Sequence, residues 1–126
     1  MKTLFLFILT FTLFSFTLNN DEWVVPAKYE TMKNPTDPKV DLAFGKIMYN
    51  QHCKSCHGAE GYGDGTKAGG LDGDLGDFST AEFQKQTDGS LFYKTKVGRD
   101  DMPSYSKKLS EEDIWLIVNY IRTLKE

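Results

Sequence analysis

Two cysteines and a histidine stand together in the segment Cys53-Lys54-Ser55-Cys56-His57. One turn of helix would bring both sulfur atoms within reach of the two vinyl groups of one porphyrin. The adjacent imidazole would then lie under the ring, where it can bind the iron as proximal ligand. Covalent haem attachment requires this spacing. The segment therefore predicts one haem c per chain, attached through Cys53 and Cys56 and ligated by His57.

Other sites that use paired cysteines fit this segment less well. A thioredoxin-like redox centre needs a strand-rich context, whereas the residues before Cys53 have the pattern of an amphipathic helix. A zinc site needs four ligands, and the other histidine, His52, adjoins Cys53, so its side chain would point away from the pair. A disulfide between Cys53 and Cys56 would close too small a loop to constrain much of the unfolded chain. We expect it only transiently, before haem is attached.

The first twenty residues have the composition of an export signal. Lys2 precedes a Phe- and Leu-rich apolar run over residues 3–18, and polar residues follow. The run is slightly shorter than the roughly 18 residues of a membrane-spanning helix. No small-residue cleavage box precedes residue 19. We predict a signal peptide over residues 1–20, with retention as a membrane anchor as the alternative, and a periplasmic location.

The charge balance excludes nucleic acid as a partner. The chain has 18 acidic and 15 basic residues, which gives a formal net charge of −3. Loss of residues 1–20 would remove one cation, Lys2, and leave the remainder more acidic. Such a chain offers no basic surface for DNA or RNA.

The remaining chain has no strand-like alternation and is predicted to be all-α. Residues 21–39, which we call the lead, contain three prolines and are predicted to be extended; they either lie against the domain or form a linker. The domain is predicted over residues 40–126. Its first helix is predicted over residues 39–51, where apolar residues form two neighbouring stripes at helical spacing: Val40, Phe44 and Ile47 in one, Leu42, Gly45 and Tyr49 in the other.

Glycines mark the positions where the backbone must come close to another group. Gly45 is costly inside a helix, which predicts that another helix crosses there at short distance. Residues 58–76 hold eight of the eleven glycines and are predicted to form a loop around the rim of a flat cofactor.

Capping patterns predict three further helices. Residues 79–82 have the pattern of a capping box, with Phe78 and Phe83 as a hydrophobic staple, before a short helix over residues 80–86. The next helix is predicted to begin at Asp88 or Ser90 and to stop at Gly98. The last helix is predicted to begin after Ser110, with acidic residues in its first turn.

Met102 is the candidate for the sixth position of the iron. It precedes Pro103 in the polar loop 98–105, where an isolated methionine has little packing reason to exist. A thioether is a soft ligand that favours ferrous iron, so a His/Met pair raises the reduction potential relative to two histidines. The other methionines lie in the signal, in the lead and on the first helix: Met1, Met32 and Met48.

The domain resembles the class I cytochromes c, in particular the small bacterial single-haem type. The resemblance is carried, in unbroken order, by Gly45 and Tyr49, the attachment segment, the 61–65 loop, residues 98–103 and residues 115–122. It implies three to five helices around one haem, with the first and last helices crossing near Gly45 and Tyr120. It also implies that His57 and Met102 lie on opposite haem faces.

The chain departs from many relatives in one respect. Those relatives carry a proline after the attachment segment, near the carbonyl that orients the proximal imidazole, and here none occurs between His57 and Pro103. We expect the segment from Gly69 to Leu75 to supply that carbonyl.

These features predict a periplasmic one-electron carrier rather than an enzyme, because two protein ligands leave no vacant iron site. Its expected partners are redox proteins that donate and accept electrons, and it is expected to be a monomer if soluble. One alternative is a haem-bearing subunit of a larger membrane redox complex. Another is a peroxidase or gas-binding haem protein in which Met102 is displaced, with Arg99 as the nearby distal group. Five lysines could steer an acidic partner or only be solvated: Lys85, Lys94, Lys96, Lys107 and Lys108.

Overall fold

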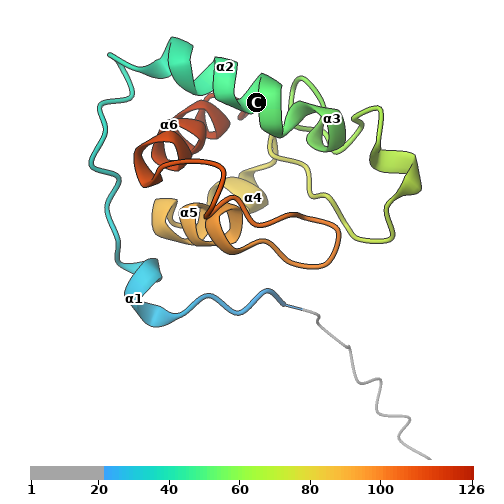
Figure 1. The fold of residues 1–126 in the computed structure, drawn as a ribbon, viewed down its shortest axis with the longest axis horizontal. Coiled ribbons are helices and arrows are strands. Elements are labelled where there is room, and N and C mark those ends of the chain that lie inside the picture. Colours follow the sequence, from blue (N-terminus) through green and yellow to red (C-terminus); the bar gives the residue numbers. More distant parts are fainter. Residues whose placement is uncertain (1–21) are drawn as a thin grey trace, which may run out of the picture.

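The computed structural model describes residues 22–126 (Figure 1). The elements are α1 (Ala27–Glu30), α2 (Leu42–His52), α3 (Lys54–His57), the 3₁₀ turn η1 (Ala68–Gly70), α4 (Ala81–Gln84), α5 (Asp88–Val97) and α6 (Glu111–Arg122). Over the described range no strand forms, and there is one isolated bridge, between Arg99 and Met102. The predicted all-α fold is confirmed.

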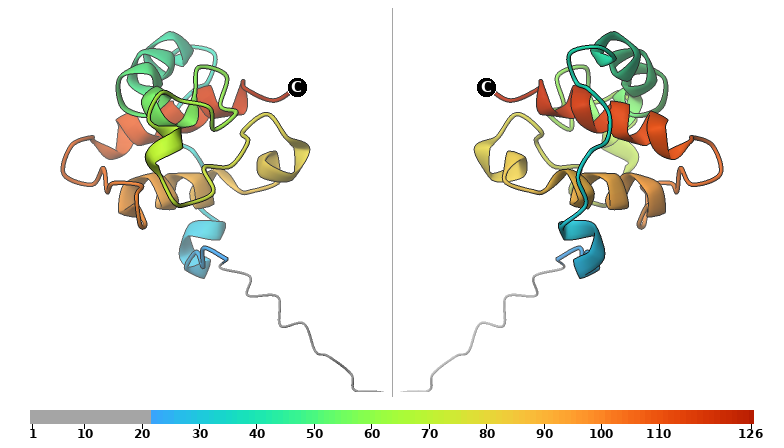
Figure 2. Two further views of the ribbon diagram at one scale, coloured as in Figure 1. Left: turned by 90° about the vertical axis from the view of Figure 1, so that its right-hand side faces the viewer. Right: turned by 90° about the vertical axis from the view of Figure 1, so that its left-hand side faces the viewer.

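Helix α6 is the centre of the core. Its residues 114–121 are all buried, and it packs against α2 on one side and α5 on the other (Figure 2). Trp115 of α6 stacks on Phe92 of α5, with ring centroids 4.1 Å apart. Ser110 and Asp113 form a capping box at its first turn, so the helix begins where the sequence predicts.

Helices α2 and α6 cross at short distance, as the position of Gly45 predicts. A Cβ atom added at Gly45 would overlap the carbonyl oxygen of Leu116 and would lie 3.4 Å from the Cβ of Tyr120. One turn further along α2, the ring of Tyr49 packs against that of Tyr120, with centroids 5.0 Å apart. The expected crossing near Gly45 and Tyr120 is confirmed.

Helix α2 differs from its prediction in two ways. It begins at Leu42 rather than at residue 39, because residues 38–40 form a turn that is closed by Asp37, whose carboxylate accepts from the Lys39 N–H at 2.8 Å. Only the stripe that contains Gly45 and Tyr49 is directed inward. The other stripe stays exposed, with exposed fractions of 73%, 49% and 58% for Val40, Phe44 and Ile47. The backbone contact at Gly45 allows only one stripe to face α6.

The lead lies against the domain and contains a short helix, α1, which the prediction of an extended segment missed. Tyr29 of α1 packs against Tyr93 and Phe92 of α5, with centroids 4.7 and 6.3 Å apart. Further along, the Asn34 amide donates to the carbonyl of Trp115 at 3.2 Å and to the side chain of Asn119 at 2.7 Å. Of the two alternatives, linker or packed segment, the structure has the packed one.

The caps of the middle helices agree with the predictions in part. At α4 the hydroxyl of Thr80 accepts from the Phe83 N–H, and the Phe78 and Phe83 rings stack at 4.4 Å. The staple is therefore present, but the capping box over residues 79–82 is not, because Thr80 is the N-cap and the Ser79 N–H donates to the Asp77 carboxylate at 2.9 Å. Helix α5 begins at Asp88 and ends before Gly98, as predicted.

None of the helices formed by residues 22–126 is both long enough and apolar enough to cross a bilayer. The predicted signal peptide over residues 1–20 lies outside the described residues.

The α2–α6 contact predicts that a side chain at residue 45 destabilises the fold. We expect Gly45→Val to lower the free energy of unfolding by about 1–3 kcal/mol through overpacking against Leu116. Gly45→Ala should also lower it, although alanine is the better helix former by about 1 kcal/mol. Denaturant unfolding of the haem-loaded protein measures both effects.

Ala43 provides the control, because it is an exposed position of the same helix. Ala43→Val should cost about 0.5 kcal/mol, the helix-propensity difference alone. If both Gly45 variants were more stable than the wild type, α2 would not cross α6 at this point.

Candidate functional site

Helices α2 and α3 place the two cysteines one turn apart. The Cys53 N–H donates to the carbonyl of Tyr49 at 2.8 Å, and the N–H of His57 donates to the carbonyl of Cys53 at 3.0 Å. Cys53, Cys56 and His57 thus follow one another on the turn in which α2 passes into α3. Both thiols are free and half-buried. Burial, and then the neighbouring Cys56, raise the pKa of the Cys53 thiol to about 12, which keeps it neutral.

His57 is held by the carbonyl of Leu75. The imidazole Nδ1 lies 3.1 Å from that oxygen. A carbonyl can only accept, so Nδ1 must carry the proton, which leaves the lone pair on Nε2 for a metal. Burial lowers the pKa of His57, although the Leu75 hydrogen bond acts in the opposite direction. The neutral ring is therefore oriented for ligation, and the expectation that residues 69–75 supply the orienting carbonyl is confirmed.

The glycine loop folds back onto the attachment segment. The N–H of Gly65 donates to the carbonyl of Cys56 at 3.0 Å, and the N–H of Lys67 donates to the carbonyl of Ser55 at 2.8 Å. A Cβ atom at Gly65 would overlap the backbone of Ser55 and Cys56. The Tyr49 hydroxyl donates to the carbonyl of Gly58 at 2.8 Å and holds the start of the loop to α2.

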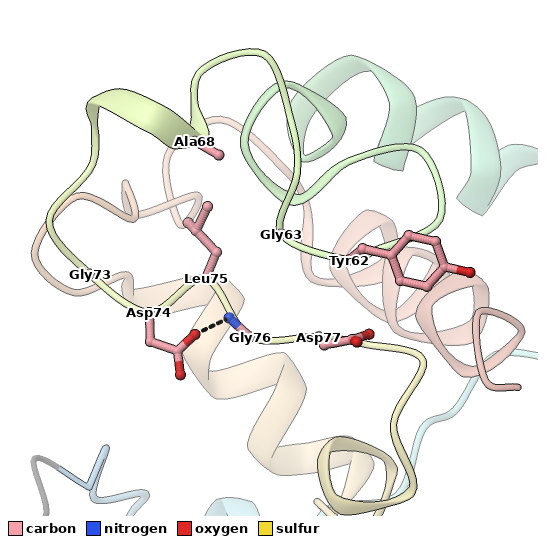
Figure 3. A pocket seen from close by; sticks show the side chains of 8 residues that line it. All are labelled: Tyr62, Gly63, Ala68, Gly73, Asp74, Leu75, Gly76 and Asp77. Carbon is pink, nitrogen blue, oxygen red and sulfur yellow. Dashed lines mark hydrogen bonds between the residues drawn. The ribbon is translucent and has the colours of Figure 1, made fainter.

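A cavity of about 310 Å³ opens on the outer part of this loop (Figure 3). Its lining residues come from two stretches of the loop, Tyr62 to Ala68 and Gly73 to Asp77. Leu75, whose carbonyl holds His57, is among them. Neither cysteine and neither candidate iron ligand lines it, so we do not assign this cavity to the cofactor.

Met102 lies in a tight turn that begins at Gly98. Arg99 and Met102 exchange two backbone hydrogen bonds, of 2.9 and 2.8 Å, and Asp100 between them has a left-handed φ of 52°. Gly98 also has a positive φ, of 70°, and a Cβ atom there would be 2.5 Å from the carbonyl oxygen of Met102. The turn is therefore defined by its backbone, and Met102 itself is half-buried.

Two side-chain contacts tie this turn to the rest of the site. The Tyr105 hydroxyl donates to the carbonyl of His52 at 2.7 Å, next to Cys53. On the other side, Asp101 accepts from the backbone N–H of Asp72 in the glycine loop at 3.2 Å. The structure thus links the Met102 turn to the attachment segment and to the loop that holds His57.

The other methionines of the described residues have packing roles. Met32 and Met48 are half-buried against the hydrophobic core. Their contacts account for them without a ligand role, which leaves Met102 as the candidate.

Several residues that serve the site were missed by sequence reasoning. Tyr105 had a signal, since it is an aromatic residue close to the candidate ligand, whereas Asp72 and Asp101 had none among the other acidic residues of their loops. Trp23 of the lead was missed as well. In the structure the Arg99 guanidinium carbon lies 4.8 Å from the centroid of its ring.

Three of the five lysines considered for steering pair with polar side chains of the chain, and a fourth, Lys108, has its Nζ 5.8 Å from the centroid of the Tyr105 ring. Lys85 pairs with Glu82, Lys96 with Glu111 at 2.5 Å, and Lys94 donates to Gln86 at 2.6 Å. Lys107 and Lys108, between the Met102 turn and α6, are exposed.

The chain is similar to known proteins in sequence and in fold. The family model described as Cytochrome c matches residues 42–125. Cytochrome c550 of Pseudomonas aeruginosa is 32% identical over 95 residues, which are 68% of this chain and 59% of that protein. The chain thus spans about three-fifths of the length of this curated relative.

Solved structures with a similar fold include a c-type cytochrome, KustC0563, with a TM-score of 0.58 and 31% identity over 65% of this chain and 98% of that one. Another is the Kuenenia stuttgartiensis reducing HAO-like protein complex Kustc0457/Kustc0458. It has a TM-score of 0.64 and 28% identity, over 75% of this chain and 50% of that one.

The contact at Gly65 predicts that the glycine loop tolerates side chains unequally. Gly65→Ala should lower the free energy of unfolding by about 1–3 kcal/mol, because the new methyl group overlaps the backbone of Cys56. Gly70 is the matched control, since nothing lies within 4 Å of a Cβ atom there. Gly70→Ala should be neutral or stabilising by up to about 1 kcal/mol. Equal effects of the two substitutions on the unfolding midpoint would show that the loop does not rest on α3.

Proposed function

This chain belongs to the cytochrome c family, and from that premise we propose that it is a periplasmic one-electron carrier with His57 and Met102 as axial ligands of its haem iron. The family carries covalent haem c and transfers electrons with redox partner proteins, and these general properties apply here. The proposal adds which residues hold the haem, where the protein works, and that it carries electrons without catalysing a further reaction.

The residues of the attachment segment suit a covalent haem. Two free thiols one helical turn apart, Cys53 and Cys56, can each form a thioether bond. His57 has its Nδ1–H engaged by Leu75, so Nε2 is free to bind iron. The bound haem supplies a one-electron ferric/ferrous couple. The observation that carries the proposal is the contact between His57 and Leu75, because a second partner of this kind is what orients metal-bound imidazoles.

Met102 is proposed as the sixth ligand on the support of its loop. The turn that presents it is defined by two backbone hydrogen bonds and is tied to the segment before Cys53 through Tyr105. A thioether stabilises the ferrous state and sets a higher potential than a second histidine would. If His57 and Met102 both bound the iron, no iron site would be left for a substrate, which favours a carrier.

A haem-bearing subunit of a larger redox complex is the second candidate. It is favoured by the similarity to the reducing HAO-like protein complex, of whose chain this protein covers half. A peroxidase or gas-binding role is less well supported. The one nearby candidate for a distal group, Arg99, is engaged by the Trp23 ring and by Asp100, whose carboxylate is 3.3 Å from its Nε.

The proposed location rests on the apolar N-terminal run and on the need for haem attachment outside the cytoplasm. The intact mass of the purified protein tests both. We expect a mass that lacks residues 1–20 and includes one haem. A protein that retains these residues and is extracted only by detergent would instead favour the membrane-bound alternative. In Cys53→Ala/Cys56→Ala, the mass should contain no haem.

The ligand assignment is tested by Met102→Ala. In the ferric wild type we expect the weak long-wavelength charge-transfer band that the family resemblance implies for methionine ligation, and in the variant its loss. The reduction potential should fall, because the soft donor that favours ferrous iron is gone. Met48→Ala serves as the control and should keep the band. An unchanged band and potential in Met102→Ala would show that another residue is the ligand.

A further inference from the structure

The indole of Trp23 faces two cations of the domain. The Arg99 guanidinium carbon lies 4.8 Å from the ring centroid, and the Lys94 Nζ lies 5.6 Å from it. Both distances are within the range of cation–π attraction, for which tryptophan is the best acceptor. Trp23 is half-buried, whereas its neighbour Val24 is 79% exposed. The ring therefore makes a specific contact with these two side chains.

Arg99 is also the backbone partner of Met102. The two residues exchange both hydrogen bonds of the turn, and the strained Asp100 lies between them. A displacement of the Arg99 backbone would therefore break both hydrogen bonds of the turn that presents Met102. The charge of Arg99 acts on Lys94 as well. Burial lowers the pKa of Lys94, and Arg99 lowers it further, while Glu30 and Glu22 act in the opposite direction. The ring attracts both cations and so offsets the repulsion between them.

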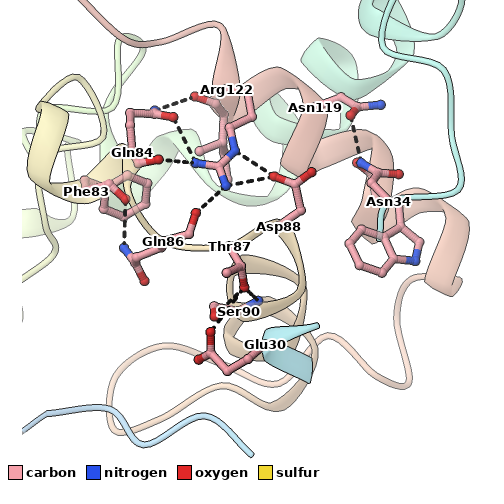
Figure 4. A network of polar contacts seen from close by, with 12 residues as sticks. Glu30, Asn34, Phe83, Gln84, Gln86, Thr87, Asp88, Ser90, Asn119 and Arg122 are labelled. Carbon is pink, nitrogen blue, oxygen red and sulfur yellow. Dashed lines mark hydrogen bonds and ion pairs between the residues drawn. The ribbon is translucent and has the colours of Figure 1, made fainter. Parts of the chain in front are cut away.

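The segment that follows Trp23 in the lead is anchored to the domain at separate points. The backbone of Tyr29 lies so close to α5 that a Cβ atom at Gly89 would overlap its carbonyl. The Thr87 hydroxyl donates to Glu30 at 3.4 Å, and Asn34 is held by Asn119 (Figure 4). These contacts hold the lead against α5 and α6 and thereby limit the movement of Trp23.

We infer that Trp23 is a positioning residue for the Met102 turn: its ring holds the Arg99 guanidinium, and through Arg99 it keeps Met102 in place as an iron ligand. This inference rests on the proposed ligation by Met102. The lead would then help to retain Met102 on the iron. Simple packing of the lead against the domain would have no such effect.

Imidazole binding to the ferric, haem-loaded protein measures this role, because imidazole binds iron only when the sixth ligand leaves. Trp23→Ala should bind imidazole roughly threefold to tenfold more tightly than wild type, the range that the loss of such a contact implies. Trp23→Phe, which keeps a ring face, should restore most of the wild-type affinity. Val24→Ala is the matched control in the lead and should bind imidazole as wild type does.

Arg99→Gln tests the link from Trp23 to Met102 without a change in the lead. It should raise the imidazole affinity by a similar factor, and the double variant Trp23→Ala/Arg99→Gln should show no more than the larger single effect, because the two residues act through one contact. Additive effects in the double variant, or wild-type affinity in Trp23→Ala, would overturn the inference while the Met102 assignment stands.

The charge-transfer band separates the two proposals. If wild type has the band and Met102→Ala lacks it, the imidazole titrations decide the role of Trp23 alone. If wild type lacks the band, Met102 is not the ligand, and both proposals are overturned. Unfolding midpoints of the same variants identify a general loss of stability. A lower midpoint with unchanged imidazole affinity would leave Trp23 a packing residue and overturn the inference.

Discussion

The close approach of α2 and α6 at Gly45 determines where the cofactor segment begins. Because the two backbones meet there with no side chain between them, rotation or sliding of α2 would bring a side chain of α2 against the backbone of Leu116. Tyr49, one turn later, is fully buried against Tyr120, and its hydroxyl holds the carbonyl of Gly58. The turn with both cysteines and His57 lies between these two fixed points. The position of the proposed haem-binding residues thus follows from a contact between two backbones.

Loops rather than helices carry the remaining site residues, and each loop is fixed by hydrogen bonds to its neighbours. The glycine loop is joined to the attachment segment at Gly63, whose N–H donates to the carbonyl of His57 at 2.9 Å, and at Gly65. The contact between Asp101 and Asp72 joins it to the Met102 turn. A domain of this size buries a modest fraction of its surface, so the haem is expected to supply a large part of the apolar core. The loops then have a common surface on which to pack.

Local signals in the sequence were sufficient for the attachment segment, the caps of α5 and α6, the crossing at Gly45 and the segment that orients His57. Each depends on a few neighbouring residues or on a glycine that only a close contact explains. The orientation of α2 was not predictable, since helical spacing marked two stripes and could not tell which one faces α6. The long-range polar contacts were not predictable either. Arg122 could be read as a charge at a helix end, yet its Nε donates to Asp88 at 2.8 Å and its guanidinium also binds Gln84 (Figure 4).

The lead lies before the part of the chain that matches the cytochrome c family, which begins at residue 42. It does not contribute to the α2–α6 crossing or to the contact between His57 and Leu75. Its contacts are instead with α5, with the outer side of α6 and with Arg99. The two sides of the proposed iron site are therefore supported by different parts of the chain. The proximal side depends on the helix crossing and the glycine loop, whereas the turn that presents Met102 depends also on a segment outside the family domain. A change in the lead can then affect Met102, the proposed sixth ligand, while it leaves haem attachment intact.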